Sequence, residues 1–269
     1  MPTIQLNNAN LYYEQHGEGP ETLLFAHGLL WSGRMFDLQV DALKDRYRCI
    51  TFDFRGQGRS EVTASGYDMD TLSRDAATLI ENLECVPCHF ISLSMGGFIG
   101  LRLAIHHPEL IQSLDPEPTE NLGRYRFLNF IARWFGLTVV ANRIMPIVFG
   151  QTFLTDPART YLKADWRQRI IANDRIGITR TTQGVITRQG IYEQLGQIKA
   201  PTLILVGDQD VATQPIHSER MHHGIPHSEQ VIISGAGHTS TIEEPDAVNE
   251  ALAEFLHRQS HSDDCRLLT

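Results

Sequence analysis

The segment Phe90-Ile91-Ser92-Leu93-Ser94-Met95-Gly96 is the most informative part of this 269-residue chain. It joins a short apolar run, which ends at Ile91, to a helix-like run over 97–106. A serine at a sharp turn between a strand and a helix, with small residues two positions before and after it, is typical of a nucleophile elbow. The turn strains the backbone at Ser94, and Gly96 avoids a collision with neighbouring backbone. The motif predicts that the Ser94 hydroxyl stands clear of the strand.

The same letters also fit a small-residue helix start that carries no chemistry. Ser92 meets the demand for a small residue only approximately, because glycine is usual at that position. The choice between the two interpretations therefore depends on the rest of the chain.

Apolar runs and helical patterns alternate along most of the chain. Continuous or alternating apolar runs predict strands at 11–16, 22–26, 47–52, 89–91, 202–206 and 230–233. Helical spacing predicts helices at 35–43, 70–84, 97–106, 216–223 and 246–258. This order predicts an α/β fold with a mainly parallel sheet and helices on both faces.

The alternation breaks between residues 120 and 197, where no strand pattern is evident. Apolar residues recur there at helical spacing, among them Phe127, Phe130, Ile131, Trp134, Leu162, Trp166 and Ile170. We predict an inserted helical lid over 120–197, between core segments 1–119 and 198–269. Most of the lid aromatics are expected to pack the lid onto the core, and a few to face an apolar cavity.

Composition excludes several classes of function. The net charge of −9 argues against nucleic acid and against a membrane surface as partners. No apolar segment is long enough to span a bilayer, and the N-terminus does not resemble a signal peptide. Cys85-Val86-Pro87-Cys88 has no second ligand pair for zinc, so we interpret these cysteines as packing thiols. Few cysteines and no disulfide framework favour the cytoplasm. The oligomeric state is not predicted.

A serine hydroxyl is a weak nucleophile unless a base, itself oriented by a third group, takes its proton. In this topology the partners follow in the order serine, acid, histidine. Among the 12 histidines, only His238 has both the right order and a position at the end of a predicted strand, just after Gly235-Ala236-Gly237. We therefore expect His238 to be the base for Ser94.

The acid is less well determined by position. Asp208 and Asp210 both follow the strand predicted at 202–206, and spacing does not separate them. Asp115 and Glu117 are more remote alternatives after the elbow helix.

An oxyanion hole needs two N–H donors aimed at the site where negative charge develops. The N–H of Met95, the residue after the serine, is the first candidate. The second is expected from the loop after Ala26, with Leu29 N–H as our choice because Gly28 allows a close approach. His27 is interpreted as an anchor of this loop.

The ordered set of motifs resembles the lidded serine hydrolases of the α/β-hydrolase superfamily, among them 3-oxoadipate enol-lactonases and small carboxylesterases. The resemblance covers nearly the whole chain and rests on His27-Gly28, Asp53-x-Arg55-Gly56-x-Gly58-x-Ser60, Ser92-x-Ser94-Met95-Gly96-Gly97, Gly207-x-x-Asp210 and Gly237-His238. It implies the α/β-hydrolase fold, a triad of Ser94, Asp210 and His238, and oxyanion donors at Leu29 and Met95. It favours Asp210 over Asp208, and it implies that 53–60 is a structural loop near the pocket. The short segment after Pro108 departs from the family pattern and predicts a curtailed sixth strand.

The expected activity is hydrolysis of a small or medium carboxylic ester or lactone through an acyl-enzyme, with no metal and no cofactor. Related epoxide hydrolases and dehalogenases use an aspartate nucleophile, so Ser94 argues against both. Two alternatives stay open: a serine-dependent C–C bond hydrolase with the same residues, and a low-turnover ligand-binding protein on a hydrolase scaffold.

Overall fold

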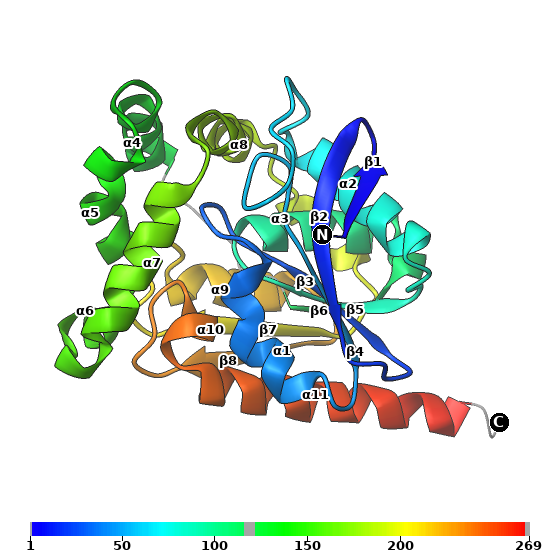
Figure 1. Ribbon diagram of the computed structural model, residues 1–269. Coiled ribbons are helices and arrows are strands. Elements are labelled where there is room, and N and C mark those ends of the chain that lie inside the picture. Colours follow the sequence, from blue (N-terminus) through cyan, green and yellow to red (C-terminus); the bar gives the residue numbers. More distant parts are fainter. Residues whose placement is uncertain (1, 116–121, 267–269) are drawn as a thin grey trace.

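The computed structural model describes residues 2–115 and 122–266, and these form one central sheet flanked by helices (Figure 1). The strands follow one another across the sheet in the order β1-β2-β4-β3-β5-β6-β7-β8. Their bounds are β1 Thr3–Leu6, β2 Ala9–His16, β3 Thr22–Ala26, β4 Arg48–Phe52, β5 Cys88–Ser92, β6 Ile111–Asp115, β7 Thr202–Gly207 and β8 Ser228–Ile233.

The sheet is parallel from β4 to β8, and only β1 and β2 pair antiparallel with their neighbours. In the centre, Leu24 of β3 pairs with Ile50 of β4 on one side and with Phe90 of β5 on the other. The predicted mainly parallel α/β architecture is confirmed.

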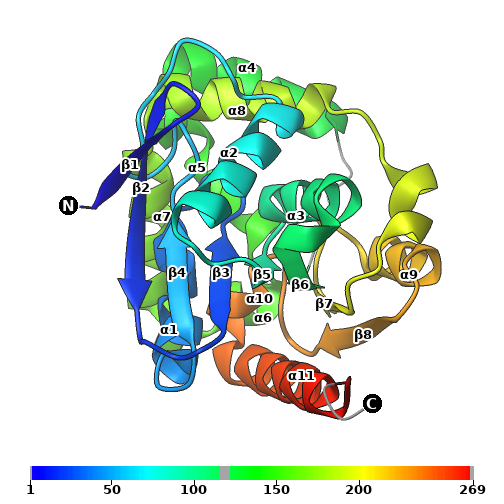
Figure 2. The ribbon, with the colours of Figure 1, turned by 90° about the vertical axis from the view of Figure 1, so that its right-hand side faces the viewer.

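Both faces of the sheet are covered, which explains the unbroken apolar runs. Leu23 and Phe25 belong to the core beneath helices α1 (Asp37–Leu43) and α11 (Pro245–Arg266). Leu24 and Ala26 point to the opposite core, beneath α2 (Met69–Asn82), α3 (Met95–His106) and α9 (Pro215–Gly224). Figure 2 shows the sheet between these two layers.

The segment between β6 and β7 is helical where the structure describes it. Its helices are α4 Leu122–Phe135, α5 Leu137–Val148, α6 Gln151–Thr155, α7 Thr160–Ala172 and α8 Arg175–Thr187, and α10 Ser240–Glu243 follows later. Short 3-10 helices occupy Gly33–Phe36, Pro108–Leu110, Pro157–Arg159 and Tyr192–Gln197. In Figure 1, α4 to α7 stand to one side of the sheet. The division into a core and a lid stays a prediction.

Strand β6 is present but weakly paired on one side. It forms several pairs with β5 across an irregularity at Cys88 and His89, and one pair with β7, Leu114 with Thr202. Strand β6 ends at Asp115, directly before residues 116–121, which lie outside the described residues. That this strand is curtailed therefore stays a prediction.

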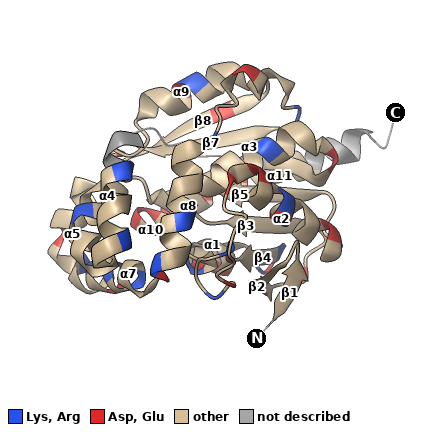
Figure 3. Cartoon of the chain, turned by 90° about the horizontal axis from the view of Figure 1, so that it is seen from above, with Lys and Arg blue, Asp and Glu red and all other residues tan. Residues whose placement is uncertain are grey.

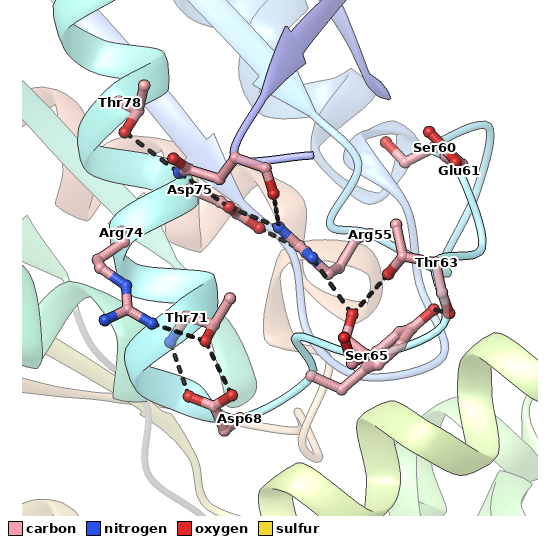
Figure 4. A network of polar contacts seen from close by, with 12 residues as sticks. Arg55, Ser60, Glu61, Thr63, Ser65, Asp68, Thr71, Arg74, Asp75 and Thr78 are labelled. Atoms are coloured by element: carbon pink, nitrogen blue, oxygen red, sulfur yellow. Dashed lines mark hydrogen bonds and ion pairs between the residues drawn. The ribbon is translucent and has the colours of Figure 1, made fainter. Parts of the chain in front are cut away.

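The loop over 53–60 is held by buried charge. Arg55 forms two hydrogen bonds to Asp75 of α2, at 2.7 and 2.8 Å, and both side chains are almost fully buried (Figure 4). Asp53 accepts from Gly33 N at 2.7 Å and from Arg59 N at 2.8 Å. A buried ion pair with both partners hydrogen-bonded resists separation, since removing one partner leaves an uncompensated charge. The loop is therefore fixed against α2.

None of the described helices is long and apolar enough to cross a membrane.

Candidate active site

Ser94 lies at the junction of β5 and α3. Its backbone dihedral angles, φ 54° and ψ −109°, are rare for residues other than glycine. The turn is pressed against the end of β3. Leu93 N–H donates to Ala26 O at 3.1 Å, and a Cβ at Gly96 would lie 2.1 Å from the same oxygen. Gly96 is thus required by the close approach of two backbones, as the motif predicts. Ser92 is buried and fits at the last position of β5.

His238 and Asp210 meet at the carboxyl ends of β8 and β7. His238 Nδ1–H donates to Asp210 Oδ2 at 2.8 Å, and Thr213 Oγ1 lies 3.1 Å from the same nitrogen. The other carboxylate oxygen, Asp210 Oδ1, accepts from Ala212 N and Thr213 N at 2.7 and 2.8 Å. These contacts fix the carboxylate and orient the imidazole, which leaves Nε2 as the acceptor of the ring.

Asp208, the competing acid, has a different set of partners. Its Oδ1 accepts from Gly235 N at 2.8 Å, and Ser234 Oγ lies 3.4 Å from Oδ2. It therefore supports the loop that leads to His238. Of the two remoter candidates, Asp115 ends β6 and Glu117 lies outside the described residues.

Four of the five predicted site residues line one cavity, and Asp210 lies behind His238. Ser94, Met95, Leu29 and His238 line it together with Leu30, Val148, Thr182 and Val185. The side chains of Ser94, Asp210 and His238 are all buried. Met95 is the first residue of α3, so its N–H has no acceptor within the helix and is available to a ligand.

The loop that carries Leu29 is anchored by His27. This buried ring has Nδ1 2.7 Å from Gly28 O, while Nε2 accepts from Phe54 N at 3.0 Å. Burial lowers the pKa of His27, so the ring stays neutral and donates from Nδ1. The interpretation of His27 as an anchor fits these contacts.

Gln57 is a site residue that sequence reasoning missed. Its Oε1 accepts from Leu30 N at 2.8 Å, and its Nε2 lies 3.8 Å from Met95 Sδ. Leu30 itself has a φ of 77°, a strained conformation for a residue with a branched side chain. Gln57 therefore connects the two segments that carry the predicted oxyanion donors. The sequence signal that could have indicated Gln57 was its position in the loop over 53–60, which was expected to lie near the pocket.

Glu243 is a second residue that the sequence did not indicate. Its buried carboxylate accepts from Gly150 N and Gly237 N through Oε2, at 2.8 and 3.0 Å, and from Thr239 N through Oε1 at 3.1 Å. Burial raises the pKa of Glu243 against the opposing effect of these donors. One carboxylate thus joins the segment after α5 to both sides of His238.

A second cavity lies beneath the predicted lid and continues the first. The two share Leu29, Leu30, Val148 and Thr182 in their walls. The remaining wall is almost entirely aliphatic and comes from α4, α5 and α8: Leu128, Asn129, Ala132, Leu137, Val140, Ile144, Ile147 and Ile178. Such a cavity suits the apolar part of a ligand whose polar part lies near Ser94.

The aromatic residues of the segment are divided between two places. Trp166 is buried against Trp31, with ring centroids 5.2 Å apart. Phe127, Phe130 and Trp134 are exposed, so these three depart from the expectation that most of the lid aromatics pack onto the core.

No group of three or more His, Cys, Asp or Glu side chains that would hold a metal ion occurs in the part of the chain that the structure describes.

The sequence of this chain matches a known protein family. The model of the alpha/beta hydrolase family matches residues 23–251. The 3-oxoadipate enol-lactonase 2 of Acinetobacter baylyi is 26% identical over 261 residues, which cover 95% of this chain and 96% of the relative.

Solved structures agree in fold. An enol-lactonase from Burkholderia xenovorans superposes with a TM-score of 0.90 at 24% identity, covering 95% of this chain and all of that one. A thermophilic esterase from Thermogutta terrifontis gives 0.87 at 25% identity, with 96% and 97% covered. With the family model spanning most of the sequence, we conclude that this chain belongs to the alpha/beta hydrolase family.

Proposed function

We propose that the protein is a serine hydrolase that cleaves a carboxylic ester or lactone with a small or medium apolar acyl group. The observation that carries the proposal is the shared cavity of Ser94, Met95, Leu29 and His238, with His238 held by Asp210 at 2.8 Å. The enol-lactonase and esterase relatives support the same reaction class.

In this proposal His238 Nε2 takes the Ser94 proton while the hydroxyl oxygen attacks the acyl carbon. Asp210 stabilises the imidazolium that forms, because its carboxylate lies against Nδ1. The N–H groups of Leu29 and Met95 donate to the oxyanion of the tetrahedral intermediate. His238 then protonates the leaving alcohol and later activates the water that releases the acid.

The aliphatic cavity beneath α4 and α5 supplies the acyl subsite. Its wall offers Asn129 and Thr182 as the polar side chains among otherwise apolar neighbours, so it favours an alkyl group over a charged one. We also propose a cytoplasmic location, because Cys49, Cys85 and Cys88 are free thiols, which suits a reducing compartment.

A fluorophosphonate probe tests the nucleophile directly. The folded protein should be labelled at Ser94, and Ser94→Ala should abolish both the label and ester hydrolysis, with a loss of at least ~10³-fold in kcat. A panel of p-nitrophenyl esters, lactones and a C–C ring-fission product then identifies the bond that is cleaved. An unlabelled Ser94 in a folded protein would instead favour the ligand-binding alternative.

A further inference from the structure

Helix α4 exposes an aromatic stripe, which we define as Phe127, Phe130 and Trp134. Spacings of three and four residues place these side chains on one face of the helix. Trp134 is 64% exposed, and the two phenylalanines are exposed to a similar degree. The opposite face, with Leu128 and Ala132, is buried in the core. Contiguous exposed apolar side chains on one helix face are a candidate interaction surface.

The stripe has a basic border. Arg126 and Arg133 of α4 lie along one side of it, and Arg133 also lines a groove with Arg175 and Arg180 of α8. Among the described residues, neither Arg133 nor Arg175 forms an ion pair with a carboxylate. Figure 3 shows positive charge along α4 and α8 at this end of the molecule.

Charge is distributed unevenly between this segment and the remainder. Residues 122–188 contain 11 Lys and Arg but only 3 Asp and Glu, and residues 121–155 contain no acidic residue at all. The segment is thus strongly positive in a chain with a net charge of −9. The expectation of no membrane partner rested on the total charge, which does not describe this surface.

We propose that the aromatic stripe of α4 docks on an anionic lipid surface, with its rings in the headgroup region and its arginines on lipid phosphates. Aromatic rings prefer the boundary between water and acyl chains, and basic residues nearby add attraction to anionic lipid. A second copy of the chain is a poorer occupant, because a two-fold contact through the stripe would bring the arginines of both copies together.

The position of the groove connects this surface to the site already described. Asn129 lines both the groove between α4 and α8 and the aliphatic cavity beneath the lid, which continues to Ser94. If the proposed hydrolase function holds, an apolar ester can pass from the lipid surface to Ser94 along this route. Docking itself does not depend on that function.

Trp134 provides a direct readout, since Trp31 and Trp166, the other two tryptophans, are buried. Vesicles of phosphatidylcholine and phosphatidylglycerol in equal parts are added to the full chain, and emission and co-sedimentation are recorded. We expect a blue shift and vesicle-bound protein, both much weaker with phosphatidylcholine alone. Ser94→Ala should bind equally well, so a failure of the hydrolase proposal leaves this result unchanged.

Surface variants separate the two contributions. The double change Phe127→Ser and Phe130→Ser should weaken partitioning by about tenfold or more, because two rings no longer enter the interface. Arg126→Gln with Arg133→Gln should weaken it by roughly 25-fold on anionic vesicles only, at about fivefold per arginine. Tyr161→Ser is the matched control, because it removes an aromatic that is 84% exposed on α7, away from the stripe.

Three results would overturn the proposal. One is the absence of both blue shift and co-sedimentation with anionic vesicles. Another is unchanged binding by the double phenylalanine variant. The last is a Trp134 shift that follows protein concentration without lipid, together with a dimer in light scattering, which would assign the stripe to a second copy.

Discussion

Replacing Gly96 with alanine should damage both stability and catalysis. The new Cβ would lie 2.1 Å from Ala26 O and 2.8 Å from Ala26 C, whereas real Cβ atoms stay at least 3.0 Å from such neighbours. One of the two backbones must therefore move by about 1 Å. Ala26 belongs to β3, which is paired on both sides by β4 and β5. The displacement consequently falls on the turn that carries Ser94.

The size of the effect follows from this displacement. Overpacking lowers the free energy of unfolding by about 1–3 kcal/mol. We expect the upper end of this range, because both atoms that the new Cβ would overlap belong to the backbone. For a chain of this length that corresponds to a melting temperature lower by roughly 6–12 °C. A shift of about 1 Å between the proposed nucleophile and the proposed oxyanion donors should lower kcat by about 10²-fold, with a smaller effect on KM.

Urea unfolding followed by circular dichroism and hydrolysis of p-nitrophenyl butyrate measure the two effects. Gly196→Ala is the matched control, because a Cβ there meets no atom within 4 Å and should change stability by less than about 0.5 kcal/mol. If Gly96→Ala matched Gly196→Ala in both assays, the close approach of the elbow to β3 would not constrain this enzyme.

Three further outcomes can be checked separately. Asp210→Asn should lower kcat by about 10⁴-fold, whereas Asp208→Asn should keep kcat within a few-fold of the unchanged protein. If steady-state kinetics showed the reverse ranking, Asp208 would be the catalytic acid instead. Glu243→Gln places an amide group among N–H donors and should lower the unfolding free energy by about 2–3 kcal/mol, and an unchanged urea midpoint would contradict this. Burial raises the pKa of Cys49 from 9.0 to about 12, so its contribution to stability is intact below pH 9.0 and is lost as pH rises from there towards about 12. The loss is roughly 2–3 kcal/mol at about pH 11, and Cys49→Ala should flatten this part of a pH–stability curve.

The buried parallel strands were the elements most accurately predicted from sequence. The run 22–26 matches β3 in full, and the run 202–206 differs from β7 by one residue. Burial on both faces favours apolar residues at nearly every position, so such runs end close to where the strand ends. The positions of Ser94, Asp210 and His238 were predicted from the same alternation of strands and helices, since each residue comes after one of these apolar runs.

Strand β1 was missed because it is short and lies at the edge of the sheet. Thr3–Leu6 has only four residues, and Leu6 is the one that is fully buried. The available signal was Asn7-Asn8, where both residues have positive φ, as in a tight hairpin turn.

The orientation of α4 shows a different limit. Helical spacing grouped Phe127, Phe130, Ile131 and Trp134, but periodicity does not say which face of a helix turns inward. Ile131 packs partly against the core, whereas the other three are exposed. Leu128 and Ala132 are smaller and face the core instead. The contact of Glu243 with Gly150 spans 93 residues, and no local pattern reports a pairing at that range.

The carboxylate of Glu243 also links His238, the proposed base, to the helix that covers the cavity. Gly150 lies two residues after Val148, the last residue of α5 and part of the cavity wall, and Gly237 directly precedes His238. A displacement of Gly150 would be transmitted through the Glu243 carboxylate to Gly237 and so to His238. A variant that breaks the Glu243 contact with Gly150 should therefore also disturb the position of His238, and a changed pH–rate profile would report it.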